Sequence, residues 1–263
     1  MRNSGIAALL LVSTLSACAT INPGSMAQAE RDPYENTNRK VYKFNRGLDR
    51  YALRPAATVY RAVIPKPART GVTNVFNNID EPVSFINAVL QGKVKRAFRT
   101  VDRFLLNTTL GVGGLADVAT KLGRPEQPED FGQTLAVWGV KSGPYLMLPL
   151  LGPSTLRDLG GFGVDFATDP VTYARNAALN PNFVETAGQF ALETIDLRSK
   201  LMDAGADGVL KSSLDEYATV RSAFLQQRRS AIYDGVLPDE DDEPVEDAPL
   251  APGATPPAPV PPQ

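Results

Sequence analysis

The chain contains no histidine, a single cysteine and no apolar run long enough to cross a membrane. The lack of histidine removes the commonest general base and the commonest metal ligand. An enzyme or a metal site is therefore less expected, although catalysis by Asp, Glu, Lys or Ser is still possible. One cysteine excludes an intramolecular disulfide. Because a spanning helix needs about 18 or more consecutive apolar residues, attachment to a membrane would have to use another device.

The single cysteine follows an N-terminal export signal. Arg2 supplies a cationic start, an apolar run covers about 6–15, and Leu15-Ser16-Ala17 stands directly before Cys18. This order is typical of a secretory signal, and the residues before the cysteine match the lipobox, in which the thiol accepts a diacylglycerol. We therefore predict a signal peptide over 1–17 and lipidation of Cys18. Two or three acyl chains, at about 0.8 kcal/mol per buried CH₂, would anchor the protein firmly to a membrane. The alternative is an ordinary signal peptide with a chance cysteine.

The charges are unevenly distributed along the chain. Seven acids and no base lie in 239–247, so that without this run and Arg2 the net charge of −2 becomes +4. A mildly basic body suits an anionic lipid surface or an acidic partner and is too weak to indicate nucleic-acid binding. Residues 18–31 predict a short polar tether. The acidic and then proline-rich stretch 236–263 predicts a disordered tail, because it cannot bury apolar area.

Residues 32–235 show the pattern of one compact all-α domain made of many short helices. No strand-like alternation and no internal repeat is evident in it. Asp32 is expected to cap the first helix, with Pro33 at its first position. Prolines cannot continue a helix, because they lack the N–H and clash with the preceding turn. Helix boundaries are therefore expected at Pro55, Pro65 and Pro67, and at Asp80-Glu81-Pro82 with Asp80 as the cap.

The clearest amphipathic pattern of the first half covers 93–111. Apolar residues recur there at the helical period, and cations occupy most of the remaining surface. Cations around an apolar stripe are typical of a helix at a membrane interface, and equally of the outside of any basic helical domain. Ser154, Asn182 and Ser213 predict further helix starts. As candidates for the side that faces lipid headgroups we name Lys93, Lys95, Arg96, Arg99 and Arg103.

The most apolar segment of the mature chain is 145–151, which is framed by Gly143-Pro144 and Gly152-Pro153. Its prolines exclude a regular helix, and a buried irregular loop would leave backbone groups unpaired. The segment is therefore expected to be paired, water-lined or next to lipid. It is either a core connector or a hydrophobic loop beside an acyl-chain path. If it is a hydrophobic loop beside an acyl-chain path, the candidates for the wall of that path are Tyr145, Leu146, Met147, Leu148, Leu150 and Leu151.

Short motifs follow one another through the domain in a fixed order. They include Asp32-Pro33-Tyr34-Glu35, Ile64-Pro65-Lys66-Pro67, Gly111-Val112-Gly113-Gly114, Phe131-Gly132-Gln133-Thr134 and Gly152-Pro153-Ser154-Thr155. The ordered set resembles the MlaA (VacJ) family of outer-membrane lipoproteins over about 32–233.

This resemblance implies a ring of helices in the periplasmic leaflet of the outer membrane, with a central amphipathic channel. It implies that phospholipids of the outer leaflet pass through the channel to a soluble periplasmic carrier of the Mla pathway. It also implies trimeric porins as partners, and neither a cofactor nor covalent chemistry. In the family, a turn in the first helix pair is linked to gating. Phe44 and Asn45 match that region, just before a point where this chain is one or two residues shorter.

Three classes of function are compatible with the residues. The first is a lipoprotein that transports phospholipids, and the second is a non-catalytic scaffold lipoprotein whose proline-rich tail binds a partner. The third is a hydrolase that uses carboxylates such as Asp80 and Glu81, whose adjacency in sequence does not show that they converge on a substrate. With the resemblance we expect the first: a lipid-anchored, non-enzymatic protein on the periplasmic face of the outer membrane, with no metal site and no nucleic-acid partner, that maintains lipid asymmetry.

Overall fold

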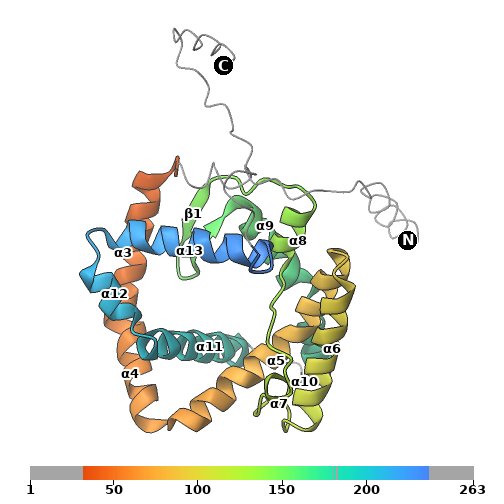
Figure 1. Ribbon diagram of the computed structural model, residues 1–263. Coiled ribbons are helices and arrows are strands. Elements are labelled where there is room, and N and C mark those ends of the chain that lie inside the picture. The colour runs from red at the N-terminus through yellow and green to blue at the C-terminus, as the bar shows by residue number, and fades with distance from the viewer. Residues whose placement is uncertain (1–31, 180, 182, 237–263) are drawn as a thin grey trace, which may run out of the picture.

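The computed structural model describes residues 32–236 except 180 and 182, and its helices form the sides of a frame (Figure 1). One side is continuous: α3 (Glu35–Leu48) passes through a π-helical turn, Asp49–Leu53, into α4 (Arg54–Val63). The next sides are α5 (Lys66–Leu90) and α6 (Val94–Thr109), and α13 (Glu216–Ile232) lies opposite α5. The remaining helices are α7 (Val118–Lys121), α8 (Phe131–Val137), α9 (Leu156–Thr168), α10 (Pro170–Leu179), α11 (Phe183–Asp203) and α12 (Ala206–Ser212).

The all-α prediction is confirmed, apart from one small hairpin. Strands β1 (Tyr145–Leu148) and β2 (Gly152–Thr155) pair antiparallel, with Tyr145 opposite Thr155 and Leu148 opposite Gly152. The sequence hides this hairpin because β1 reads Tyr-Leu-Met-Leu, which is apolar on both faces and does not alternate. The predicted signal peptide, Cys18, the tether and nearly all of the predicted tail lie outside the described residues.

The predicted break at Pro82 is wrong, because α5 continues through it to Leu90. The proline leaves the helix one N–H short, and packing against α6 holds the two halves of α5 in line. Arg103 Nε of α6 donates to Glu81 Oε1 at 2.6 Å, and Asn78 Nδ2 of α5 donates to Thr108 Oγ1 at 3.0 Å. Tertiary contacts therefore override the local signal. By contrast, the helices predicted over 93–111 and from 182 to about Met202 are confirmed to within a few residues as α6 and α11.

Three predicted helix starts are displaced. Thr155, not Ser154, caps α9 by accepting from the Asp158 N–H at 3.2 Å. Asp215, not Ser213, caps α13 by accepting from the Ala218 N–H at 3.1 Å. Asp32 precedes α3 but does not cap it; its buried carboxylate accepts hydrogen bonds from Asn38, Tyr217 and Arg221. In α9 and α13 a nearby polar residue takes the role, whereas α3 begins after Tyr34 without a side-chain cap, so that sequence locates the helix but not its cap.

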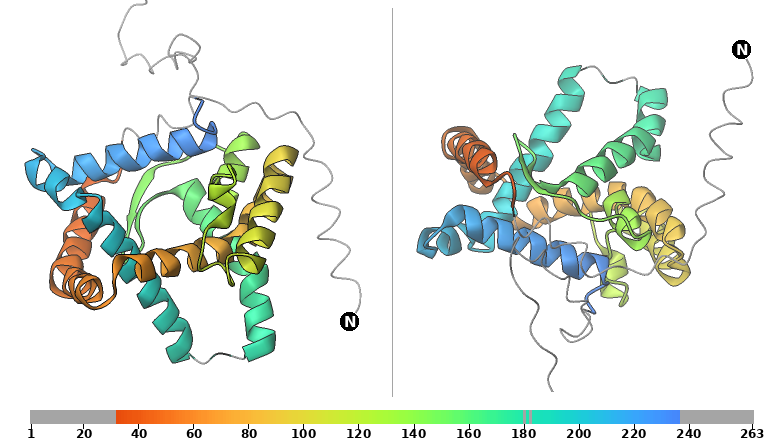
Figure 2. Two further views of the ribbon diagram at one scale, coloured as in Figure 1. Left: turned by 60° about the horizontal axis from the view of Figure 1, so that its bottom comes forward. Right: turned by 90° about the horizontal axis from the view of Figure 1, so that it is seen from above.

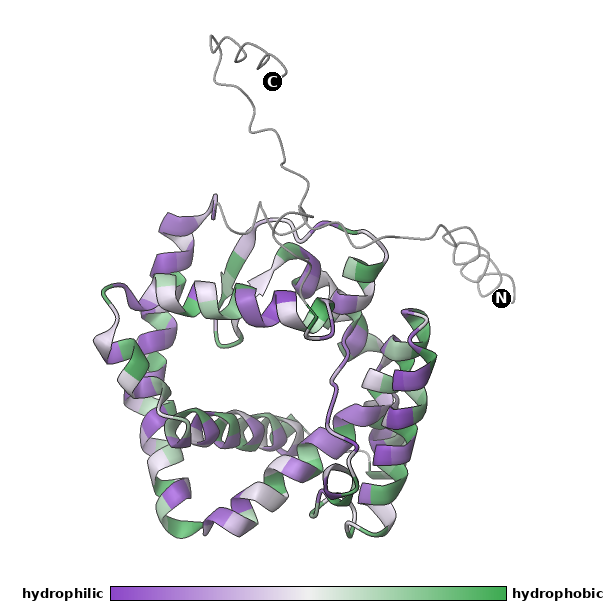
Figure 3. Ribbon diagram, in the orientation of Figure 1, coloured by the Kyte–Doolittle hydropathy of each residue, from purple (hydrophilic) through white to green (hydrophobic). Residues whose placement is uncertain are grey.

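The apolar core is small and lies where β1 meets α8 and α13. It consists of Ala136, Tyr145, Met147, Tyr217, Leu225 and Ile232. Figure 3 shows apolar residues recurring along every side of the frame rather than gathering at one centre. The corners of the frame are consequently joined by polar side chains, many of them buried.

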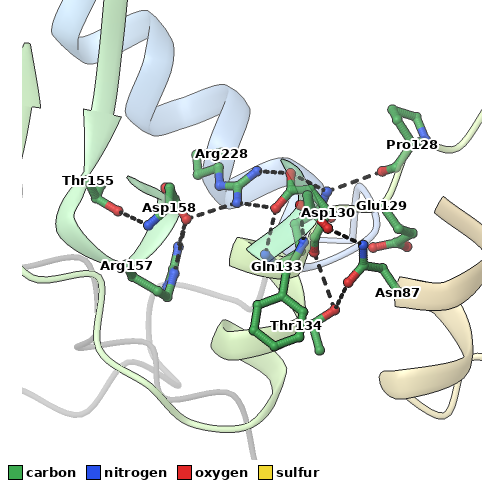
Figure 4. A network of polar contacts seen from close by, with 12 residues as sticks. Asn87, Pro128, Glu129, Asp130, Gln133, Thr134, Thr155, Arg157, Asp158 and Arg228 are labelled. Atoms are coloured by element: carbon green, nitrogen blue, oxygen red, sulfur yellow. Dashed lines mark hydrogen bonds and ion pairs between the residues drawn. The ribbon is translucent and has the colours of Figure 1, made fainter. Parts of the chain in front are cut away.

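One such corner joins α8, α9 and α13 (Figure 4). Arg228 of α13 donates to Asp130 Oδ1 at 2.6 Å and to Asp158 Oδ1 at 2.9 Å. Burial acts to raise the pKa of Asp130, but its hydrogen bond with Arg228 and the charge of that guanidinium hold the pKa below its usual value. A β-carbon on Gly161 would overlap the backbone nitrogen of Gly132, and one on Gly132 would overlap the Arg228 guanidinium. The close crossing therefore requires glycine at 161, and a side chain at 132 would displace the Arg228 guanidinium.

Replacing Gly161 by alanine is expected to destabilise the protein by about 1–3 kcal/mol, because the new methyl group meets backbone rather than a movable side chain. Gly160 precedes it in α9 and has open space where a β-carbon would lie. Gly160→Ala is thus a matched control, expected to be neutral or to stabilise the helix by about 0.5–1 kcal/mol. Thermal unfolding followed by circular dichroism compares the two; equal midpoints would contradict the close crossing.

Candidate functional site

Two asparagines of α3 hold the hairpin. Asn38 Nδ2 donates to the Tyr145 carbonyl at 2.9 Å, and its Oδ1 accepts from the Met147 N–H at 2.9 Å. Two helical turns further on, Asn45 Nδ2 donates to the Leu148 carbonyl at 2.8 Å, and its Oδ1 accepts from the Leu150 N–H at 3.0 Å. Each amide supplies one donor and one acceptor, as a neighbouring strand would. We call these four hydrogen bonds the asparagine clamp.

The residues predicted to form the wall of the acyl-chain path fall into two groups by burial. Tyr145 and Met147 are buried in the core, where the Tyr145 ring packs edge-to-face on Tyr217 with centroids 6.2 Å apart. Leu146 and Leu148 are half-buried. In the hairpin turn Leu150 is 60% exposed, with a positive φ of 68°, and its neighbour Leu151 is also exposed. Of the predicted wall, only the leucines are therefore in a position to meet a ligand.

The gating candidates lie beside the clamp. Phe44 is exposed, and Asn45 is itself one half of the clamp. The π-helical turn follows within the next residues, a local deviation from the α-helix that often marks functional sites. Shortly before this turn, Arg46 Nε pairs with Glu216 at 2.9 Å. At its first residue, Asp49 pairs with Arg198 at 2.6 Å. Sequence reasoning selected Asn45 through the resemblance but missed Asn38; the seven-residue spacing of two amides on one helix face was the available signal.

The headgroup-side candidates prove to be unlike one another. The expectation that Arg103 lies on the surface is wrong: it is 2% exposed and paired with Glu81. Lys93 and Arg96 form ion pairs with Asp234 at 2.6 and 2.8 Å. Of the five candidates, only Lys95 and Arg99 are exposed, and an Arg99 N–H donates to Gln127 Oε1 at 2.9 Å. A helical pattern alone does not distinguish a cation in solvent from one in a buried pair.

Two carboxylates that the sequence did not single out as a pair, Asp80 of α5 and Glu193 of α11, are close enough to interact electrostatically. Both side chains are exposed to solvent. Desolvation nevertheless raises the pKa of Asp80 to about 7, helped by the negative charges of Glu193 and Asp169. Desolvation also raises the pKa of Glu193. Both carboxylates therefore hold a proton more readily than a fully solvated carboxylate does.

Large apolar side chains are exposed on several helices. A surface of this kind is typical of contact with a membrane or with another protein. Within the described ranges, no helix is long and apolar enough to cross a membrane, and no group of histidine, cysteine and acidic side chains is suited to hold a metal ion. Examples are Tyr51, Val63, Phe98, Val112, Phe166, Leu179, Phe183 and Val184.

Comparison with known proteins identifies close relatives. The sequence model of the MlaA lipoprotein family matches residues 30–231. The intermembrane phospholipid transport system lipoprotein MlaA of Escherichia coli (strain K12) is 40% identical over 228 residues, which are 84% of this chain and 86% of the relative. The Haemophilus influenzae protein of the same name is 35% identical over 240 residues, 88% of this chain and 91% of the relative.

A solved structure gives the same result. It comes from work on the "structural basis for maintenance of bacterial outer membrane lipid asymmetry" and superimposes with a TM-score of 0.66 at 40% identity, covering 78% of this chain and 99% of that one. Sequence and fold therefore agree over nearly the whole frame, and the chain belongs to the MlaA lipoprotein family.

Proposed function

We propose that the protein is the outer-membrane lipoprotein of an intermembrane phospholipid transport system. Its membership of the MlaA family, and the names of relatives that are about 40% identical, support this role. In finer detail, the protein removes phospholipids from the outer leaflet and passes them to a soluble periplasmic carrier. It sits on the periplasmic face, anchored through Cys18, with a trimeric porin as its partner.

The hairpin is the observation that carries the mechanism. A phospholipid moving through an aqueous region needs shelter for its tails, because exposing both to water costs tens of kcal/mol at about 0.8 kcal/mol per CH₂. The proposal places the tails along the exposed side chains of Leu150 and Leu151, with the half-buried Leu146 and Leu148 behind them. The clamp pairs the backbone groups that such an apolar turn would otherwise leave unsatisfied.

In this proposal the lipid headgroup contacts charged side chains rather than the leucines of the hairpin. Lys95 and Arg99 are the exposed cations among the candidates of α6, and they suit a phosphate. The carboxylates Asp80 and Glu193 suit the ammonium of a zwitterionic headgroup rather than the phosphate itself. The proposal thus gives both ends of the lipid a compatible surface without any covalent step.

Replacing Leu150 by aspartate is expected to abolish complementation of a strain that lacks the protein, since a carboxylate on the tail path has to be desolvated as each lipid passes. The fold should survive, because Leu150 is exposed and aspartate tolerates a positive φ better than leucine. Leu150→Asn is the matched control, equal in shape and backbone preference but uncharged, and should retain most of the activity. The measurements are outer-leaflet phospholipid content and resistance to detergent with EDTA. Normal asymmetry in the aspartate variant would remove the hairpin from the lipid path.

Replacing Asn45 by leucine removes half of the clamp and leaves Asn38 in place. Losing two hydrogen bonds is expected to cost about 1–3 kcal/mol locally, so amide hydrogen exchange over 145–151 should accelerate while that of α13 stays unchanged. Lipid asymmetry should change in the same variant. Asn77→Leu removes one exposed contact of α5, with Glu126, and serves as the control. Unaltered exchange in the hairpin would show that Asn45 does not restrain it.

Replacing Cys18 by alanine tests the anchor. The mature wild-type chain should carry acyl groups detectable by intact-mass spectrometry, and the variant should lack them, leave the membrane fraction and fail to restore asymmetry. A wild-type N-terminus without acyl groups would refute the lipoprotein assignment.

A further inference from the structure

A cavity of about 590 Å³ lies apart from the hairpin, between α5, α10 and α11. Figure 2 shows α10 and α11 projecting from the frame on the same side, with α5 near their bases. The volume falls within the range of about 300–1,000 Å³ that is usual for pockets that bind small ligands. The cavity is lined mainly by apolar side chains, among them Val72, Val75, Phe76, Ile79, Leu115 and Leu192.

The apolar lining is not part of the core. Val72, Val75, Phe76 and Ile79 recur at the helical period and form one stripe of α5. No side chain from α11 fills the space at Gly188, where an added β-carbon would meet nothing within 4 Å. An apolar stripe facing an unfilled space costs stability unless a ligand covers it.

One cationic side chain, Arg175 of α10, also lines the cavity. An Arg175 N–H donates to Gln189 Oε1 across the gap to α11, and the buried Nε has no hydrogen-bond partner. None of the ion pairs between described residues includes Arg175. The other charged group in the lining is Asp169, which already accepts from the Val171 N–H at 2.9 Å and from the N–H and hydroxyl of Thr172 at 3.1 and 2.5 Å. The guanidinium is therefore the charged group still able to bind a ligand.

We propose that this cavity binds a glycerophospholipid, with one acyl chain along the α5 stripe and the phosphate on Arg175. A guanidinium with free donors matches phosphate oxygens in geometry and charge. The exposed apolar residues Leu179, Phe183 and Val184 at the far ends of α10 and α11 offer a surface for the second chain. The inference rests on the proposed lipid-transport function and adds to it a second binding place, to one side of the hairpin.

The test uses the full-length lipoprotein in vesicles of phosphatidylethanolamine and phosphatidylglycerol. The probe is a phosphatidylglycerol that carries a diazirine in one acyl chain, and labelled peptides are identified by mass spectrometry after irradiation. Peptides that contain 72–79 and 188–192 should be labelled. Gly188→Leu fills the cavity without backbone strain and should lower that label on the order of tenfold. Gly208→Leu makes the same change in α12, at another glycine with open space, and should not.

Arg175 is tested separately, so that the proposal does not depend on one variant folding. Arg175→Gln should lower the pocket label on the order of tenfold, as expected for losing a charge-assisted hydrogen bond, and Arg175→Lys should restore part of it. Palmitate carrying the same diazirine distinguishes a free fatty acid from a phospholipid. Pocket label from palmitate alone, or phospholipid label insensitive to both Gly188→Leu and Arg175→Gln, would overturn the proposal.

The two proposals fail in different ways. If the cavity stays unlabelled while the wild-type chain restores asymmetry and Leu150→Asp does not, the second site is refuted and transport along the hairpin stands. If the cavity binds the probe as expected but deletion of the protein leaves outer-membrane asymmetry unchanged, the transport function is refuted and the chain binds phospholipid for another purpose.

Discussion

An apolar side chain can be buried in a core or shown to the surroundings, and this chain exposes many of its large ones. Because these side chains are exposed, few apolar contacts remain to hold the helices together at the corners of the frame. Buried polar pairs join the corners instead. Arg228 binds Asp130 and Asp158, and Arg103 binds Glu81. Such pairs are directional, and breaking one leaves a charge buried without a partner. The frame is therefore held in one geometry by a few guanidinium groups, and Gly132 at the α8–α9 crossing makes room for that of Arg228.

The same constraint explains the asparagine clamp. On the proposed function, an apolar turn that meets lipid cannot rely on water to satisfy its backbone, and both strands of a short hairpin are edge strands with unpaired groups. Asn38 and Asn45 supply those partners from the side chains of a helix, so that no third strand is needed. The hairpin can then present Leu150 outward and still pack Tyr145 inward.

The sequence predicted what depends on local pattern and failed where distant partners decide. The helical period located α6 and α11 to within a few residues, and the ordered motifs indicated the family. Pro82 should have ended a helix, but contacts with α6 carry α5 through it. Arg103 followed the same pattern as Lys95, yet it pairs with a carboxylate 22 positions away and is buried. The hairpin was missed because β1 is apolar on both faces, and because the amides that hold it lie in α3, more than 100 positions earlier.

On the proposed function, α3 couples the hairpin of the lipid path to α11 and α13. One face of the helix holds the hairpin through Asn45, and the next residues reach α13 and α11 through Arg46 and Asp49. A rotation of α3 at the π-helical turn would strain both sets of contacts together. The tip of the hairpin therefore cannot move far while these ion pairs and the clamp persist.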